Sequence, residues 1–238
     1  MESLQDKVVL LTGATGGIGA KTAALLTSSK ARVFITGRNE SALHAVAQSA
    51  GIPLSQCLLM DITCVNEVNA AVAAVLQAAG TIDILVNAAG IGIIRTMDQL
   101  TSDDFMQSLQ TNLIGPFYLM KAVLPAMKEK KKGLIIQIPG VLGKVPMAGA
   151  AAYSASKYGL TGMMQSIREE IKRTDIRITQ LFLGGVDSSF WDRIELRVQR
   201  DKMIIAEEAA RAIWFLCQQP SSGVVSEMVL QPFNHQAI

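Results

Sequence analysis

The chain has 238 residues, half of them hydrophobic, and its 22 Lys and Arg against 20 Asp and Glu give a formal net charge of +2. This length suits one large domain with a substantial core, and so small a charge does not favour nucleic-acid binding. Because the first residues are polar and acidic and no apolar run reaches about 18 residues, we expect a cytoplasmic protein without a secretory signal or a membrane span.

Residues suited to metal binding are few. The three cysteines, Cys57, Cys64 and Cys217, are odd in number and lack Cys-x-x-Cys spacing, which indicates reduced thiols rather than disulfides or a zinc site. His44 and His235 are the only imidazoles. We therefore expect neither a metal site nor a histidine-based triad.

Residues 7–29, KVVLLTGATGGIGAKTAALLTSS, have the strand, turn, helix order of a nucleotide-binding unit. Gly13 suits the positive backbone angles of a tight turn, and Gly19 lets the new helix pack close to the strand. The helix N-terminus then offers free N–H groups to a pyrophosphate. We interpret the turn as a dinucleotide-binding loop rather than a glycine-rich surface loop, with predicted contacts at Thr12, Gly13, Thr15, Gly17, Ile18 and Gly19.

Strand-like and helix-like segments alternate along the rest of the chain. After the opening unit we expect strands at residues 32–36, 57–60, 82–86, 134–138, 176–183 and 224–230, and helices at 41–49, 65–79, about 105–130, about 151–173 and 206–218. Near-continuous apolar strands between helices indicate a parallel sheet covered on both faces. The predicted fold is a single-domain, Rossmann-like, doubly wound α/β fold of about seven strands.

Such a sheet binds its ligand beyond the carboxyl ends of the strands. The second strand ends in FITGRN, where Gly37 replaces the acidic residue that would bind the ribose of NAD and Arg38 offers a guanidinium suited to a 2′-phosphate. This favours NADP(H), with an ordinary surface arginine as the alternative. We include Asn39 in the predicted site.

Two further strand ends extend the predicted cofactor site. Asp61, followed by Ile62, is either an acceptor for the adenine amino group or a helix cap. Asn87 is suited to tie adjacent strands together, and the small residues after it, Ala88, Ala89 and Gly90, allow the backbone to lie against the ribose. Residues 91–94 form a pocket wall or lid, or are simply buried, which we favour.

Four motifs, taken in order, resemble the short-chain dehydrogenase/reductase family across essentially the whole chain. They are TGATGGIG, NAAG at residues 87–90, Asn112 within TNLIGPF, and YSASK at residues 153–157. The resemblance implies a reversible NADP(H)-dependent reductase of ketones or aldehydes. A narrower function that the resemblance also implies is that of a 3-oxoacyl carrier-protein reductase.

Tyr153 and Lys157 lie one helical turn apart, hence on the same helix face. A nearby ammonium favours the phenolate, so we expect a lowered tyrosine pKa. The resemblance implies that Tyr153 protonates the carbonyl oxygen, that Lys157 also holds the nicotinamide ribose, and that Asn112 supports a proton relay. Polar residues on a helix surface and a helix kink or cap are the alternatives.

One position departs from the family pattern. The catalytic serine thirteen residues before the tyrosine is replaced by Gly140, and no Ser or Thr occurs at residues 134–152. Losing one oxyanion donor typically costs about 10²- to 10³-fold in rate. Our hypothesis is that a bound water or a hydroxyl of the substrate replaces the missing serine donor. The alternative function is a catalytically idle NADP(H)-binding module.

The segment after the sixth strand, LFLGGVDSS, completes the predicted site. By analogy Gly184, Val186 and Ser188 orient the nicotinamide. Residues 188–200 form a substrate lid or a fixed core face. The predicted substrate wall comprises Gly140, Val141, Leu142, Met147, Tyr153, Gly185, Phe190 and Trp191, and it favours an apolar or aromatic carbonyl.

The resemblance also implies partners. The helices carrying residues 118–127 and 163–171 match family oligomer faces, so we expect a homodimer or homotetramer, although an internal core explains the same pattern. The basic residues 128–132 and 172–173 match the docking site of an acyl carrier protein. Cations that complement helix C-termini are the favoured interpretation.

Overall fold

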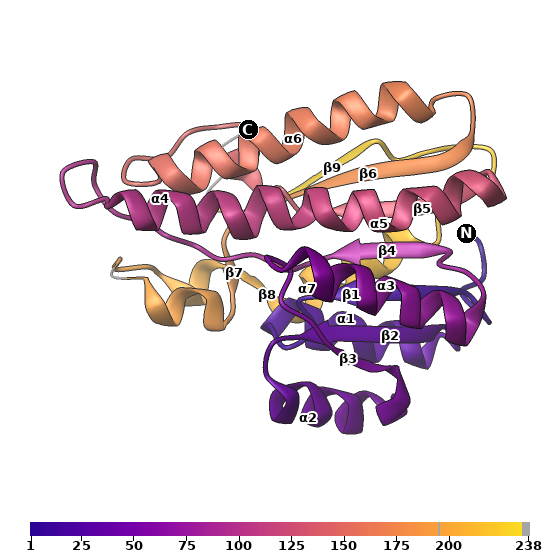
Figure 1. Ribbon diagram of the computed structural model, residues 1–238. Helices are drawn as coiled ribbons and strands as arrows, with labels where there is room; N and C mark the ends of the chain where they lie inside the picture. Colours follow the sequence, from indigo (N-terminus) through magenta and orange to yellow (C-terminus); the bar gives the residue numbers. More distant parts are fainter. Residues whose placement is uncertain (195, 235–238) are drawn as a thin grey trace.

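The computed structural model describes residues 1–194 and 196–234 and shows a sheet with helices on both faces (Figure 1). The sheet has seven strands in the order β3-β2-β1-β4-β5-β6-β9, and every pair is parallel. Its strands are β1 (Val8–Thr12), β2 (Arg32–Gly37), β3 (Cys57–Leu59), β4 (Ile84–Asn87), β5 (Lys132–Gln137), β6 (Asp175–Leu183) and β9 (Glu227–Leu230). The helices are α1 (Gly17–Ser28), α2 (Glu40–Ala50), α3 (Val65–Ala79), α4 (Ser102–Leu109), α5 (Gly115–Lys130), α6 (Ala151–Ile171) and α7 (Ala206–Cys217). The predicted fold class is confirmed.

Two hydrophobic cores lie on opposite faces of the sheet. Successive strand residues point to opposite faces, so Leu11 joins the core beneath α1, α2 and α7, whereas Leu10 joins the core beneath α3, α5 and α6. Both residues are fully buried. This double burial explains why the strands are apolar throughout instead of alternating.

The helix expected at about residues 105–130 starts earlier and is interrupted. It begins at Ser102, where Thr101 and Asp104 form a capping box, and a π-helical segment at Gln110–Ile114 joins α4 to α5. Figure 1 shows the three parts as one rod. The cap pattern Thr-x-x-Asp is present in the sequence. The first helical turn is polar, however, so a helix start placed by apolar periodicity falls later.

The end of the chain also differs from expectation. The last strand begins at Glu227 rather than at residue 224, and β7 (Val186–Asp187) and β8 (Ile204–Ile205) form a small second sheet that no pattern indicated. Strands of two residues carry no detectable periodicity. None of the helices within residues 1–194 and 196–234 is long and apolar enough to cross a membrane.

A row of hydrogen bonds ties three strand ends together. Thr12, Asn87 and Gln137 occupy paired positions on β1, β4 and β5. The Thr12 hydroxyl donates to Asn87 Oδ1 at 2.6 Å, and Asn87 Nδ2 donates to Gln137 Oε1 at 2.8 Å. Asn87 therefore ties the strands as expected. The row fixes the level at which the loops after β1, β4 and β5 leave the sheet.

The turn after β1 depends on close backbone packing. Gly13 has φ 69°, and a Cβ at Gly19 would lie 2.2 Å from the Gly13 carbonyl oxygen. Real Cβ atoms do not approach this closely, so α1 reaches the turn only because residue 19 lacks a side chain. Both expectations for these glycines are confirmed.

Gly19→Ala is therefore expected to lower the free energy of unfolding by about 1–3 kcal/mol, because the added methyl forces α1 away from the turn. Urea titration measures the change. Gly16→Ala is the matched control, since its Cβ would meet only the Gly13 oxygen, at 3.4 Å. Equal destabilisation by the two variants would contradict the packing explanation.

Candidate active site

A cleft of about 920 Å³ opens at the carboxyl edge of the sheet. Its walls come from the turn after β1, the loop after β4 and the segment that follows β7. These are the loops that a doubly wound fold uses for ligands. Of the predicted cofactor residues, the wall contains Gly13, Gly17, Ile18, Gly19, Arg38, Ala88, Gly90 and Ser188.

Several predicted cofactor residues have side chains that bond or pack within the protein. Thr12 is fully buried and its hydroxyl donates to Asn87 Oδ1, so these two side chains bond to each other. The Asn39 side chain caps α2 by accepting from the Ala42 N–H at 2.8 Å. Ile62 is buried in the core on the α3 face. The cleft wall does not include the others, which are Thr15, Gly37, Asp61, Ala89, Gly184 and Val186.

Arg38, which lines the cleft, lies close to Asp61. Arg38 Nη1 is 3.8 Å from Asp61 Oδ2, and both side chains are substantially exposed, so the pair is weak. Asp61 also accepts from the N–H and the hydroxyl of Thr63, which closes the turn before α3. A smaller hollow of about 310 Å³ beside Arg38 includes Thr63 and Gln110. The Arg38 guanidinium is thus available to a ligand.

Tyr153 and Lys157 meet on one face of α6, as expected. Lys157 Nζ lies 5.5 Å from the centre of the Tyr153 ring and donates to the Ile138 carbonyl at 3.0 Å. Because Ile138 directly follows β5, the sheet fixes the position of the ammonium. A Cβ at Gly90 would lie 3.5 Å from Lys157 Nζ, which places the end of the NAAG motif beside this pair.

Burial dominates the electrostatics of the pair. Desolvation lowers the pKa of Lys157 to about 8. Tyr153 remains partly exposed as a residue, yet the protein atoms around it raise its pKa above the ordinary value. The expected lowering of the tyrosine pKa by the ammonium is therefore wrong for this structure. The phenol keeps its proton at neutral pH, as a proton donor must.

Asn112 acts as a clamp between helix and loop. It is fully buried in the π-helical segment, its Oδ1 accepts from the Ile91 N–H at 2.9 Å, and its Nδ2 donates to Ile91 O at 2.9 Å and to Ser156 Oγ at 3.1 Å. π-Helical segments are frequent at functional sites. The amide therefore fixes the loop after β4 against the helix that carries Tyr153.

Gly140 has a backbone conformation that disfavours the missing serine. Its φ of 71° and ψ of 168° lie in a region almost exclusive to glycine. A Cβ there would lie 3.9 Å from the Tyr153 hydroxyl and 3.4 Å from Leu183 O. Residue 140 thus lies beside the Tyr153 hydroxyl, where the family serine is expected. A serine at this position would strain the backbone, so Gly140→Ser is a poor test of the missing donor.

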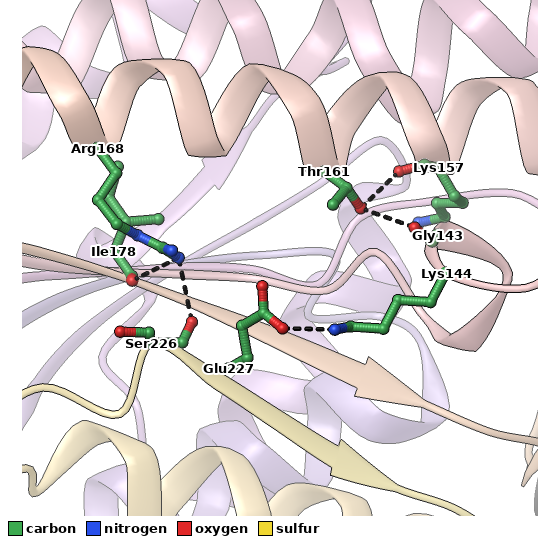
Figure 2. A network of polar contacts seen from close by, with 8 residues as sticks. All are labelled: Gly143, Lys144, Lys157, Thr161, Arg168, Ile178, Ser226 and Glu227. Atoms are coloured by element: carbon green, nitrogen blue, oxygen red, sulfur yellow. Dashed lines mark hydrogen bonds and ion pairs between the residues drawn. The ribbon is translucent and has the colours of Figure 1, made fainter. Parts of the chain in front are cut away.

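The turn after Gly140 is held by α6 and β9 (Figure 2). The Thr161 hydroxyl lies 3.3 Å from Gly143 O, the Tyr158 hydroxyl donates to Lys144 O at 2.5 Å, and Lys144 Nζ pairs with Glu227 at 2.5 Å. Lys144 Nζ also lies 4.4 Å from the centre of the Phe182 ring. The pairing keeps the Lys144 charge at β9, and Lys144 is not part of the cleft wall.

The cleft wall shares few residues with the predicted substrate wall. Of the predicted residues, the cleft wall contains Phe190. Tyr153 is not part of the wall, but its ring centre lies 5.9 Å from that of Phe190. The wall also does not include Gly140, Val141, Leu142, Met147, Gly185 or Trp191. The loop residues 91–94, which we expected to be buried, are partly exposed and line the cleft. Sequence reasoning also missed Arg95, Gln99, Asp104 and Gln107, which line the same wall.

Part of the segment predicted as a lid lines the cleft, namely Ser188, Ser189, Phe190, Asp192 and Ile194. Residues Ser189–Arg193 form a short 3-10 helix, whose Phe190 N–H donates to Ser188 Oγ at 3.4 Å. Arg200 pairs with Asp192 and lies 3.7 Å from Asp187. Glu195 of this segment and His235 lie outside the described residues. Within the described ranges, no three His, Cys, Asp or Glu side chains gather to hold a metal ion.

The lowered pKa of Lys157 predicts a pH-dependent contribution to stability. From about pH 8 to the ordinary lysine value of 10.5, the unfolded state binds a proton that the folded state lacks, so stability rises with pH in this window. The unfolding free energy of the wild type relative to Lys157→Met should increase by about 1.4 kcal/mol per pH unit there. Denaturant titrations at about pH 7 to about pH 9.5 test this; a constant difference would contradict it.

Comparison with known proteins supports the resemblance carried by the motifs. A family model described as short chain dehydrogenase matches residues 7–198. An uncharacterised oxidoreductase of Staphylococcus saprophyticus is 31% identical over 241 residues, covering 98% of each chain.

Solved structures agree with this match. A metagenomic short-chain oxidoreductase in complex with NADP has a TM-score of 0.84 at 30% identity, covering 98% of this chain and 100% of that one. A variant actinorhodin polyketide ketoreductase with NADPH has a TM-score of 0.84 at 28% identity, covering 98% of each chain. Since motifs, fold and relatives agree over most of the sequence, the chain belongs to the short-chain dehydrogenase/reductase family of oxidoreductases.

Proposed function

We propose that the protein is an NADP(H)-dependent reductase that converts a ketone or aldehyde to an alcohol, reversibly. The observation that carries this proposal is the juxtaposition of Tyr153 with Lys157 beside a cleft that runs from the glycine turn to the segment after β7. Residues 1–238 act as one catalytic unit in this proposal, and the segment at about 188–200 serves as the substrate lid.

The cleft residues fit a phosphorylated dinucleotide. The N-cap of α1, Gly16, has no side-chain cap, so the first N–H groups of α1 remain free for a pyrophosphate. Arg38 is available to a 2′-phosphate, and Gly37 occupies the position where an acidic side chain would bind the ribose of NAD. Lys157 would hold the nicotinamide ribose. Bound NADPH would supply the hydride, and the family members solved with NADP or NADPH support this choice.

The residues of the chain then supply positioning and a proton. Tyr153 donates its phenolic proton to the carbonyl oxygen, and its raised pKa keeps that proton in place at neutral pH. Asn112 fixes the loop that faces Tyr153. Because Gly140 offers no hydroxyl, the oxyanion receives one side-chain donor fewer than in typical family members.

Arg38 makes the cofactor preference testable. Arg38→Ala should raise KM for NADPH about 10- to 100-fold, the value of one charge-assisted contact, and leave KM for NADH nearly unchanged. Initial rates with the two cofactors measure this. Arg32→Ala is a control that removes an equal charge at the start of β2; the proposal fails if both variants weaken NADPH alike.

Tyr153 makes the chemistry testable. NADPH oxidation with a panel of apolar ketones should fall at least about 10²-fold in Tyr153→Phe, whereas the Kd for NADPH stays unchanged because the ring is retained. Tyr118→Phe, on α5, is the matched control and should keep wild-type turnover. Wild-type rates in Tyr153→Phe would remove the phenol from the mechanism.

A second candidate function is an NADP(H)-binding module with little turnover, and the conformation of Gly140 favours it. Tight NADPH binding without oxidation over a broad panel would support that alternative. A carrier-protein reductase is less supported, because Lys172 of the basic group is paired with Glu169 at 2.8 Å.

We also infer that the protein is a cytoplasmic homodimer or homotetramer. The exposed apolar or aromatic side chains Met106, Phe117 and Tyr158 on α4, α5 and α6 support the oligomer.

A further inference from the structure

Gly92 and Phe190, far apart in the sequence, are in direct contact in the cleft wall. A Cβ built on Gly92 would lie 2.2 Å from Phe190 Cζ, 2.7 Å from Cε2 and 2.9 Å from Cε1. No side chain fits at residue 92 while the ring occupies this position. We propose that Gly92 is the seat of Phe190, meaning that the missing side chain at residue 92 leaves the space that the Phe190 ring occupies. We also propose that the ring in this position sets the width of the substrate pocket beside Tyr153.

Backbone geometry does not account for the glycine. The glycines with positive φ are Gly13, Gly51, Gly80, Gly140 and Gly149. Gly92 is not among them, so alanine is compatible with its backbone. The ring of Phe190 is the obstacle that a side chain would meet.

Aromatic neighbours hold the ring in its seat. The Phe190 ring centre lies 5.9 Å from that of Tyr153, with the planes tilted by 56°, and 5.2 Å from that of Trp191, with the planes at 81°. Edge-on and tilted aromatic pairs at these distances are attractive. The Trp191 indole donates to Val186 O at 2.9 Å, which fixes that neighbour to β7.

The segment has a second glycine contact on the other side of the cleft. A Cβ on Gly17 would lie 3.1 Å from Ser188 Cβ, so Ser188 packs against the turn after β1. Residues 188–190 therefore span the cleft from Gly17 to Gly92. Both ends of this short segment therefore contact glycines.

The seated ring restricts access to the phenol. At 5.9 Å between ring centres, Phe190 and Tyr153 are in contact and leave no space for a substrate between them. A carbonyl compound must reach the Tyr153 hydroxyl along the free side of the phenol. This favours small or flat apolar carbonyls and disfavours those with a bulky group on the Phe190 side. The inference about substrates rests on the proposed function.

The kinetic test compares a small ketone, cyclohexanone, with a bulky one, 4-phenylcyclohexanone. Gly92→Ala displaces the ring and should raise the kcat/KM ratio of bulky to small ketone about tenfold or more. Phe190→Ala should do the same, and adding Gly92→Ala to Phe190→Ala should change nothing further, because the obstacle is gone. An equal effect of Gly92→Ala in both backgrounds would overturn the seat.

Fluorescence tests the seat without requiring turnover. Trp191 and Trp214 are the only tryptophans, so in a Trp214→Phe background the emission reports Trp191 alone. Gly92→Ala should shift this emission to the red and increase its quenching by iodide. Gly162→Ala, whose Cβ would meet nothing within 4 Å, is the control and should leave emission unchanged.

The two readouts separate the two proposals. A wild type that neither binds nor oxidises NADPH would overturn the proposed function, while the Trp191 emission would still decide the seat. Wild-type emission in Gly92→Ala would overturn the seat whatever the kinetics show.

Discussion

The parallel register of β1, β4 and β5 is the constraint on which the site depends. Thr12, Asn87 and Gln137 stand at paired positions, so their side chains form one buried row of hydrogen bonds. An unpaired amide in this row would cost about 1–3 kcal/mol, which holds the strand ends at a common level. The glycine turn, the loop after β4 and the Ile138 carbonyl leave the sheet from that level, and the site inherits their relative positions.

Desolvation sets the protonation states at this edge. The ammonium of Lys157 lies under the protein surface, bonded to one backbone carbonyl, and Tyr153 lies against it and against Phe190. With little water nearby, both groups favour their neutral forms, so the pKa of Lys157 is lowered and the pKa of Tyr153 is raised. The phenol stays a donor, and the charge of Lys157 becomes sensitive to mildly alkaline pH.

The sequence carried much of the fold because local patterns were consistent with it. The apolar runs at β1 and β4 and the spacing of α3 reported burial directly, and Gly13 and Gly19 were readable because their roles depend on residues only a few positions away. The hydrogen bond of the Thr12 hydroxyl could not be predicted in the same way, because its partner, Asn87, lies 75 positions later. The tyrosine pKa was misassigned for a related reason: spacing reveals the neighbouring ammonium but not the burial that outweighs it.

The substrate side of the site is where local reading is weakest. Gly92 sits in an apolar run that resembles a buried segment, and only the approach of Phe190, 98 positions away by number, gives the missing side chain a purpose. Gly140 is similar, because it has a positive φ and precedes a turn held by Tyr158, Thr161 and the Lys144–Glu227 pair. Loops lack the regular periodicity that reports burial in helices and strands. Their shape comes from contacts between distant segments, such as Gly92 with Phe190, which only the folded chain brings together.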